Sequence, residues 1–254
     1  MLQQSDPIGC NIDDVSCSFN NNNLKNKSMK ILVACEESQA VTIELRKLGH
    51  EAFSCDILGC GGNNPEWHVM DDVESVILNA PFHTQNGDRH VIKNWDMMIA
   101  FPPCTHLSVS GARHFEGKRK DGRQKDAIKF FMMLMNADIP KIAIENPVNI
   151  IGGKYIPKHF PDLMEKYNFR SSDQIVQPYE FGDEAQKTTC LWLKGLPKLV
   201  PTDIVGKGEF YTSPSGKRLP KWYNENSNNK KTRQQSRSVT FEGIAKAMAT
   251  QWTK

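Results

Sequence analysis

The chain has 254 residues, of which 39% are hydrophobic and 24% are charged, so it can bury one good core but not clearly two. Its formal net charge of +3 is too small for every face to attract nucleic acid, which leaves that role to a local concentration of basic residues. Its seven cysteines lack the spacing of a small secreted domain, which favours reduced thiols in a cytoplasm. The sequence has no run of about 18 apolar residues and no export signal, so we expect no membrane partner.

Residues 1–28 contain the Asn-rich run "FNNNNLKNKS" and few large apolar side chains. Burying so little apolar surface cannot offset the entropy lost on ordering, so we expect a disordered leader. Order is expected from Met29, which could itself be encoded by the start codon.

The first ordered residues predict a strand, a helix and a second strand. The run "MKILVA" is short and apolar, as in a strand buried on both faces. We expect Ser38 to cap a helix that ends near Gly49, and "HEAFSCDI" to follow as the next strand. This unit opens a parallel α/β sheet, in which ligands bind at the carboxyl ends of the strands.

The same alternation continues along the chain, with strands expected at 67–69, 95–100 and 141–146 and helices at 72–79 and 123–136. Residues 174–193 are expected to form two strands joined by a polar turn, antiparallel at the sheet edge. The predicted fold class is therefore α/β, with a mostly parallel central sheet and an antiparallel edge.

The composition changes after residue 200, and the expected domains follow this change. Residues 29–200 form the core, 201–236 a short basic segment, and 237–254 a C-terminal amphipathic helix that packs back on the core. Lysines and arginines in the basic segment outnumber acidic residues and alternate with aromatic ones. A charge run is usually a solvated loop, but interleaved aromatic rings favour DNA contact, since cations neutralise phosphates while rings stack on bases.

Three loops are expected at one edge of the sheet: "ACEES" after the first strand, "PPCTHLS" after the fourth and "ENPV" after the fifth. Such loops are neighbours in space, so Cys104 and Glu145 could face one pocket. A lone cysteine is more often a small buried hydrophobe, and Glu145 could be a surface carboxylate. The two prolines before Cys104 favour an exposed thiol at a strand end.

The segment "FPPCTHLSVSG" resembles the proline-cysteine loop of DNA cytosine-5 methyltransferases, and "IENPV" resembles their Glu-Asn loop. "QPYEFGDEAQKTTCLWLKGLP" and "RSVTFEGIAKAMATQW" are similar to late segments of the small phage and prophage branch. The resemblance extends from Met29 to Lys254. It implies the class I S-adenosylmethionine-dependent methyltransferase (Rossmann-like) fold, and a phage- or prophage-encoded monomer in the cytoplasm of a bacterial host.

The resemblance also implies a reaction, transfer of a methyl group from S-adenosylmethionine to C5 of a flipped cytosine. Cys104 is expected to add to C6, while Glu145 bonds N3 and N4 of the base. Asn146 and Pro147 would fix the loop after Glu145, and Pro103 would hold the thiol through its rigid backbone. Ser108 and Ser110 would contact the phosphate of the flipped nucleotide. Lys187 is expected at the substrate, as the one cation where the family usually has two arginines.

The cofactor site is expected around the glycine-free loop that contains Cys35, Glu36 and Ser38, where a helix N-terminus can receive a carboxylate. Asp56 is placed to bond the ribose hydroxyls and Asp72 to reach the adenine, although both could equally be helix or turn caps. Ile57 and Pro102 complete the expected cofactor contacts.

Lys217, Arg218 and Lys221 are the expected DNA contacts of the basic segment. No metal is expected, because Cys55, Cys60 and His68 are followed by no second pair at finger spacing. Two alternatives stay open: a catalytically weak or inactive DNA-binding relative, and a methyltransferase that acts on single-stranded DNA or a nucleotide.

Overall fold

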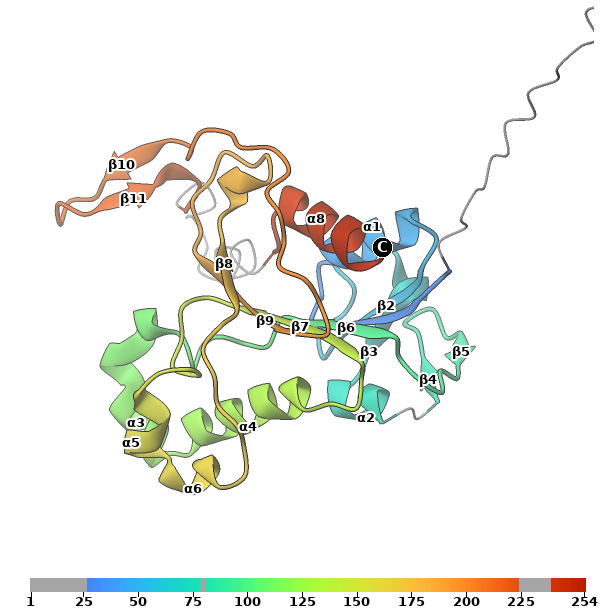
Figure 1. Cartoon of the computed structure of the whole chain (residues 1–254), viewed down its shortest axis with the longest axis horizontal. Helices are drawn as coiled ribbons and strands as arrows, with labels where there is room; N and C mark the ends of the chain where they lie inside the picture. Colours follow the sequence, from blue (N-terminus) through green and yellow to red (C-terminus); the bar gives the residue numbers. More distant parts are fainter. Residues whose placement is uncertain (1–26, 79–80, 224–238) are drawn as a thin grey trace, which may run out of the picture.

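The computed structural model describes residues 27–78, 81–223 and 239–254, and its centre is a seven-stranded sheet of order β3-β2-β1-β6-β7-β9-β8 (Figure 1). Residues 1–26 of the predicted leader and residues 224–236 of the predicted basic segment lie outside the described residues. The sheet strands are β1 (Lys30–Ala34), β2 (Glu51–Asp56), β3 (His68–Met70), β6 (Met97–Ala100), β7 (Lys141–Asn146), β8 (Gln174–Val176) and β9 (Thr189–Lys194).

Five neighbouring strands, from β3 to β7 in sheet order, run parallel, whereas β9 is antiparallel to both β7 and β8. The predicted fold class, α/β with a mostly parallel central sheet and an antiparallel edge, is confirmed. The next strand along the chain, β2, pairs with one side of β1, whereas the later strand β6 pairs with its other side. In open α/β sheets ligands bind where the strand order reverses in this way, at the carboxyl ends of the strands.

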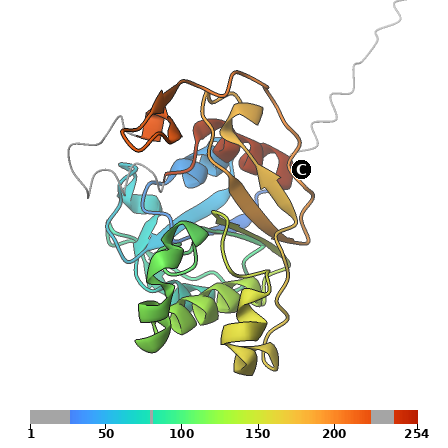
Figure 2. The same cartoon turned by 90° about the vertical axis from the view of Figure 1, so that its left-hand side faces the viewer.

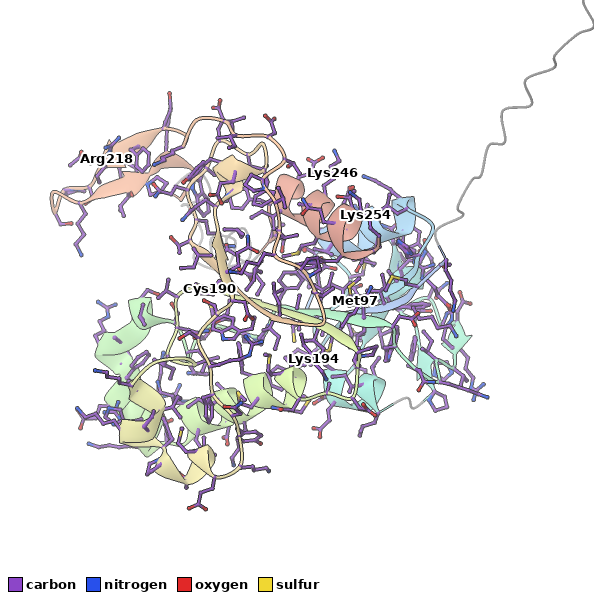
Figure 3. The ribbon with its side chains drawn as sticks, in the orientation of Figure 1. Met97, Cys190, Lys194, Arg218, Lys246 and Lys254 are labelled. Carbon is purple, nitrogen blue, oxygen red and sulfur yellow. The ribbon has the colours of Figure 1, made fainter. Side chains whose placement is uncertain are left out.

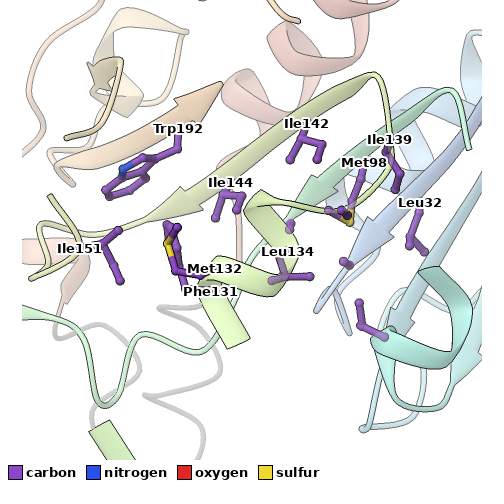
Figure 4. Packing of buried hydrophobic residues seen from close by; sticks show 14 of the residues in the cluster. Leu32, Met98, Phe131, Met132, Leu134, Ile139, Ile142, Ile144, Ile151 and Trp192 are labelled. Atoms are coloured by element: carbon purple, nitrogen blue, oxygen red, sulfur yellow. The ribbon is translucent and has the colours of Figure 1, made fainter. Parts of the chain in front are cut away.

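Alternate residues of the central strands point into two hydrophobic cores. Leu32, Met98 and Ile142 face the layer that contains α2 and α4, where Phe131 packs edge-on against Trp192 with ring centroids 5.1 Å apart (Figure 4). Ile31 and Met97 face α1 and α8 on the other side. The helices are α1 (Ala40–Lys47), α2 (Val73–Ile77), α3 (Phe115–Lys120), α4 (Arg123–Met135), α5 (Tyr155–His159), α6 (Pro161–Met164) and α8 (Glu242–Trp252).

The sequence analysis did not anticipate the small elements outside the sheet. These are the helices α3, α5 and α6, which gather near one end of α4, and two antiparallel ribbons (Figures 1 and 2). One ribbon pairs β4 (Phe82–His83) with β5 (Arg89–His90), and the other pairs β10 (Phe210–Thr212) with β11 (Arg218–Pro220). Strands of two or three residues are too short for a periodic pattern.

The C-terminal helix α8 packs on α1 and fixes the segments beside it. The Trp252 indole N–H donates to the carbonyl oxygen of Pro197 at 2.9 Å. Before α8, two glutamine amides hold one extended segment: Gln174 bonds both backbone groups of Leu199, and Gln251 bonds both of Val200. No helix among the described residues has the length and apolar character to cross a membrane.

The N-terminus of α8 approaches the backbone of the 178–183 loop closely. A Cβ atom on Gly243 would lie 1.8 Å from the carbonyl oxygen of Phe181. We therefore expect Gly243→Ala to lower the free energy of unfolding by about 1–3 kcal/mol or more, because the helix must move away from the loop. Urea denaturation measures this change.

Gly117 in α3 provides the matched control, because a Cβ there meets nothing within 4 Å. Gly117→Ala should leave the stability unchanged or raise it by about 0.5–1 kcal/mol, through the lower conformational freedom of alanine in the unfolded chain. Equal effects of the two substitutions would contradict the close approach of α8.

Candidate active site

The loops after β1, β6 and β7 leave the sheet at the same edge, as the sequence predicts. Ala34 and Ala100 are paired in the parallel ladder, and Ala100 is paired in turn with Ile144. The Phe101 N–H donates to the carbonyl oxygen of Ala34 at 2.9 Å, so the first two loops start side by side. These contacts bring the proline-cysteine and Glu-Asn loops together.

The Cys104 thiol is half-buried in a tight turn that follows Pro102 and Pro103. The backbone N–H groups of Leu107 and Ser108 both donate to the carbonyl oxygen of Cys104, at 3.0 and 2.9 Å. Burial raises the pKa of the thiol, the charge of Glu145 raises it further, and the ammonium groups of Lys187 and Lys118 lower it. Cys104 and Glu145 therefore interact electrostatically across the ends of adjacent strands.

Burial also raises the pKa of the Glu145 carboxyl, while the charge of Lys187 and a hydrogen bond from the Thr189 hydroxyl lower it. A carboxyl with a raised pKa keeps its proton to a higher pH than an exposed glutamate does. Thr189 begins β9, the antiparallel neighbour of β7, and its role was missed by the sequence analysis. The polar start of an otherwise apolar strand is the signal that could have identified it.

Asn146 lies between the two loops and is 1% exposed. Its side-chain amide donates to the carbonyl oxygen of Pro102 at 2.8 Å, and its own oxygen accepts from the Asn149 amide at 3.0 Å. Pro102 is buried and Pro103 is exposed. Asn146 thus connects the backbone before Cys104 to the backbone after Glu145.

The Ser108 hydroxyl is engaged locally, since it caps the short 3-10 helix Val109–His114 and lies 2.9 Å from the Ser110 hydroxyl. Ser110 is exposed. A second residue missed by the sequence analysis, Lys118 of α3, donates from its ammonium to the carbonyl oxygen of Thr105 at 2.5 Å. Nothing in the local sequence distinguishes this lysine from its exposed neighbours.

The loop after β1 differs from the sequence prediction. The helix α1 begins at Ala40 and not after a Ser38 cap, and the buried carboxylate of Glu36 accepts from the N–H groups of Val41 and Thr42, at 2.6 and 3.3 Å. The Thr42 hydroxyl also donates to Glu36, at 2.7 Å. The expectation that this helix N-terminus receives a ligand carboxylate is therefore wrong for these two amides, since Glu36 already bonds them.

Gln39 completes this glycine-free loop. Its side chain is fully buried, donates to the carbonyl oxygen of Asn64 at 2.9 Å and accepts from the Asn64 N–H at 3.1 Å. Both Cys35 and Gln39 have left-handed backbone conformations, with φ near 58° and 59°. The loop after β2 is in this way held against the loop after β1.

Three of the predicted cofactor contacts gather at the ends of β1, β2 and β3. Asp56 and Asp72 both lie near the Cys35 thiol, whose pKa is raised by burial first and by these carboxylates second. Ile57 is 77% exposed beside them. Asp72 accepts from the Glu74 N–H at 2.8 Å, so it caps α2, which is the alternative that the sequence left open.

The predicted DNA contacts Lys217 and Arg218 are exposed on the β10–β11 ribbon, which extends away from the sheet (Figures 1 and 3). The Arg218 guanidinium stacks over the Phe210 ring at 4.3 Å. Lys221 differs from them, because its ammonium is bonded to the Glu209 carboxylate at 2.5 Å. Figure 3 shows Arg218 apart from Cys190, the β9 partner of Asn146, so the ribbon is a separate part of any site.

The residues weighed as zinc ligands are hydrogen-bonded in other ways. His68 lies 2.9 Å from the Ser54 hydroxyl and 2.8 Å from the carbonyl oxygen of Leu58. The Cys60 thiol donates to Gln39, and the Cys55 thiol to the carbonyl oxygen of Asp71. Among the described residues no group of three His, Cys, Asp or Glu side chains is arranged to hold a metal ion.

The fold and these residues define an open α/β protein with a thiol and a carboxyl at the ends of β6 and β7. They lie beside the strand-order reversal between β1 and β6, which is where such folds carry their sites. No protein-family model and no curated protein matches the sequence.

Solved structures that resemble the fold include two methyltransferases. One is assigned as a DNA modification methyltransferase encoded within an E. coli prophage, with 16% identity, a TM-score of 0.44, and coverage of 70% of this chain and 52% of that one. The other is the Entamoeba histolytica methyltransferase EhMeth, with 14% identity, a TM-score of 0.38, and coverage of 70% and 58%. The chain thus matches little more than half the length of either structure, and identities this low say nothing about the reaction.

Glu36 should make the stability depend on pH. Burial raises the pKa of its carboxyl from 4.5 to about 7, so the folded state holds the proton more tightly than the unfolded state. The free energy of unfolding should fall by roughly 3 kcal/mol from this group as the pH rises through that interval. Glu36→Gln should remove this part of the pH dependence, measured by urea denaturation at several pH values.

The control is Glu116→Gln, which removes an exposed carboxylate from α3. The stability of Glu36→Gln relative to wild type should increase with pH, and that of Glu116→Gln should not follow it. Parallel pH curves for wild type and Glu36→Gln would contradict the burial of a titrating carboxyl at the start of α1.

Proposed function

We propose that this protein is an S-adenosylmethionine-dependent DNA methyltransferase that modifies C5 of cytosine through a covalent bond between Cys104 and C6. The observation that carries the proposal is the pairing of the Cys104 thiol with the Glu145 carboxyl at adjacent strand ends, with Lys187 near both. A nucleophile beside a proton-carrying group is the arrangement that addition to an electron-poor ring requires.

Cys104 is the proposed nucleophile. Cytosine C5 is a weak nucleophile until a thiolate adds to C6, which converts the ring to an enamine. The positive charges of Lys187 and Lys118 favour the thiolate and so support this role. The two preceding prolines restrict the backbone and hold the sulfur at the end of β6.

Glu145 is the proposed proton donor to N3 of the base. When the sulfur adds to C6, negative charge develops on the ring, and a protonated carboxyl neutralises it by donating to N3. The raised pKa of Glu145 supports this role, because the proton must be present near neutral pH. After methylation the C5 proton leaves to solvent, N3 returns its proton to Glu145, and the Cys104 sulfur is expelled.

S-adenosylmethionine, when bound, would supply the electrophilic methyl group. The residues at the ends of β1 and β2 fit its nucleoside part, since one Asp56 oxygen accepts from the Leu58 N–H and the other can accept from ribose hydroxyls. The exposed Ile57 side chain offers an apolar surface to the adenine ring. Because Glu36 bonds the first amides of α1, the methionine carboxylate of the donor would have to bind elsewhere.

The β10–β11 ribbon is the proposed DNA-binding element. C6 of cytosine lies inside the base stack of a duplex, so the nucleotide must be flipped out or single-stranded to reach Cys104. A two-stranded ribbon is of a size that enters the major groove, which favours a duplex substrate. Lys217 and Arg218 on the exposed ribbon would bind phosphates or base edges.

DNA that carries 5-fluorocytosine at its target should trap the enzyme when S-adenosylmethionine is present, because fluorine cannot leave as the C5 proton does. We expect a denaturation-resistant adduct whose peptide map places the DNA on Cys104. Cys104→Ser should form no adduct and transfer no methyl group, since a hydroxyl is far less ionised than a thiol. Glu145→Gln should lose most of the rate while it keeps the fold.

Binding and chemistry are separated by the same experiment. Cys104→Ser should still bind DNA, because the proposed phosphate contacts lie on the ribbon. Methylation by Cys104→Ser at the wild-type rate, or an adduct on another cysteine, would overturn the assignment of the nucleophile. DNA binding with neither methylation nor an adduct in the wild type would favour the inactive relative.

Removal of the ribbon charges should weaken DNA binding in a salt-dependent way. The double variant Lys217→Ala with Arg218→Ala should reduce the slope of log affinity against log salt by about 2, because fewer counterions are released. Fluorescence anisotropy over a salt series measures this slope. Lys246→Ala with Lys254→Ala removes two exposed charges from the C-terminal region and is the control (Figure 3). Equal slopes for the two double variants would remove the ribbon from the DNA interface.

A further inference from the structure

Lys118 is a buried cation next to the proposed nucleophile. The residue is 9% exposed, its ammonium donates to the carbonyl oxygen of Thr105 at 2.5 Å, and it lies 5.8 Å from the centre of the Phe115 ring. Among the described residues, no carboxylate forms an ion pair with this ammonium within 4.0 Å. A charge so placed loses hydration without gaining an ion pair.

The Lys118 ammonium also lies close to the 3-10 helix that follows the Cys104 loop. A Cβ atom on Gly111 would lie 3.4 Å from the lysine nitrogen, at van der Waals contact. Gln124 of α4 is fully buried and donates to the carbonyl oxygen of His106 at 3.1 Å. It therefore also holds the loop that contains Cys104. The loop from Cys104 to Ser108 is therefore held by side chains from two helices that follow it in sequence.

We propose that Lys118 is a positioning residue that holds the Cys104 loop through Thr105 and supplies a second positive charge beside the Cys104 sulfur. The inference rests on the proposed role of Cys104 as nucleophile.

The charges that face Cys104 come from three directions. Glu145 lies on β7, Lys187 precedes β9, and Lys118 reaches in from α3. His106 lies in the same loop as Cys104. Burial lowers the pKa of the His106 imidazole, and the charge of Lys118 lowers this pKa further. Burial and Glu145 raise the pKa of the thiol, whereas the ammonium groups of Lys187 and Lys118 oppose this effect. Loss of the Lys118 charge would remove one of these opposing contributions and so favour the thiol over the thiolate.

The test uses the full chain without DNA or S-adenosylmethionine. Iodoacetamide alkylation of Cys104 is followed by peptide mapping between about pH 6 and pH 10, where thiols titrate. Two neutral variants separate the hydrogen bond to Thr105 from the positive charge: Lys118→Gln can still donate to Thr105, whereas Lys118→Met cannot. Lys118→Arg keeps the charge. Lys120→Met, on the same helix but bonded to the Glu116 carboxylate at 2.8 Å, is the matched control.

We expect both neutral variants to alkylate several-fold more slowly at neutral pH and to move the inflection of the profile to higher pH. Lys118→Arg and Lys120→Met should keep the wild-type profile. An unchanged profile in the neutral variants overturns the proposal, and so does loss of the fold in both of them by circular dichroism, which would make Lys118 a stability residue. Because the assay contains no DNA, its failure is distinct from failure of the 5-fluorocytosine trap.

Discussion

The hydrogen bond from the Asn146 amide to the carbonyl oxygen of Pro102 is the contact on which the candidate site depends. Parallel pairing of β6 and β7 brings their carboxyl ends to one level, but loops that leave a sheet can diverge. Asn146 prevents this by joining the backbone before Cys104 to the residue after Glu145. Because its amide is buried, loss of the bond would leave a polar group without a partner, which keeps the two loops together.

The loop after β1 makes a sharp turn without glycine. Cys35 and Gln39 adopt left-handed conformations that favour glycine, and such conformations are unfavourable for other residues. The buried side chains of Glu36 and Gln39 compensate with hydrogen bonds to the start of α1 and to Asn64. The turn is held by side chains in place of backbone freedom, so its shape depends on two polar residues that a glycine-rich turn would not need.

The sequence predicted the central sheet, α1, α2, α4 and α8 because long apolar runs and helical periods report burial directly. It also brought Cys104 and Glu145 together, since strand ends in a parallel sheet are neighbours. The sequence predicted a cap of α1 at Ser38. A local capping rule cannot anticipate that the carboxylate of Glu36, two residues before Ser38, bonds the first turn of the helix. Lys118 and Thr189 were missed for a related reason. Their importance comes from tertiary contacts with the Cys104 loop and with Glu145. The sequence around Lys118 carries no sign of its contact, whereas the signal for Thr189 is only the polar start of an otherwise apolar strand.

Two glutamine side chains each bond both backbone groups of one residue, Leu199 or Val200, as a neighbouring strand would in a β-ladder. They fix the backbone just before the chain departs toward the β10–β11 ribbon. Beyond this anchor, no described residue from 201 to 223 belongs to either hydrophobic core. Evolution can therefore exchange the ribbon, in length or in sequence, without disturbing the sheet. A fixed sheet with an interchangeable outer ribbon is a simple route by which one scaffold acquires new binding surfaces.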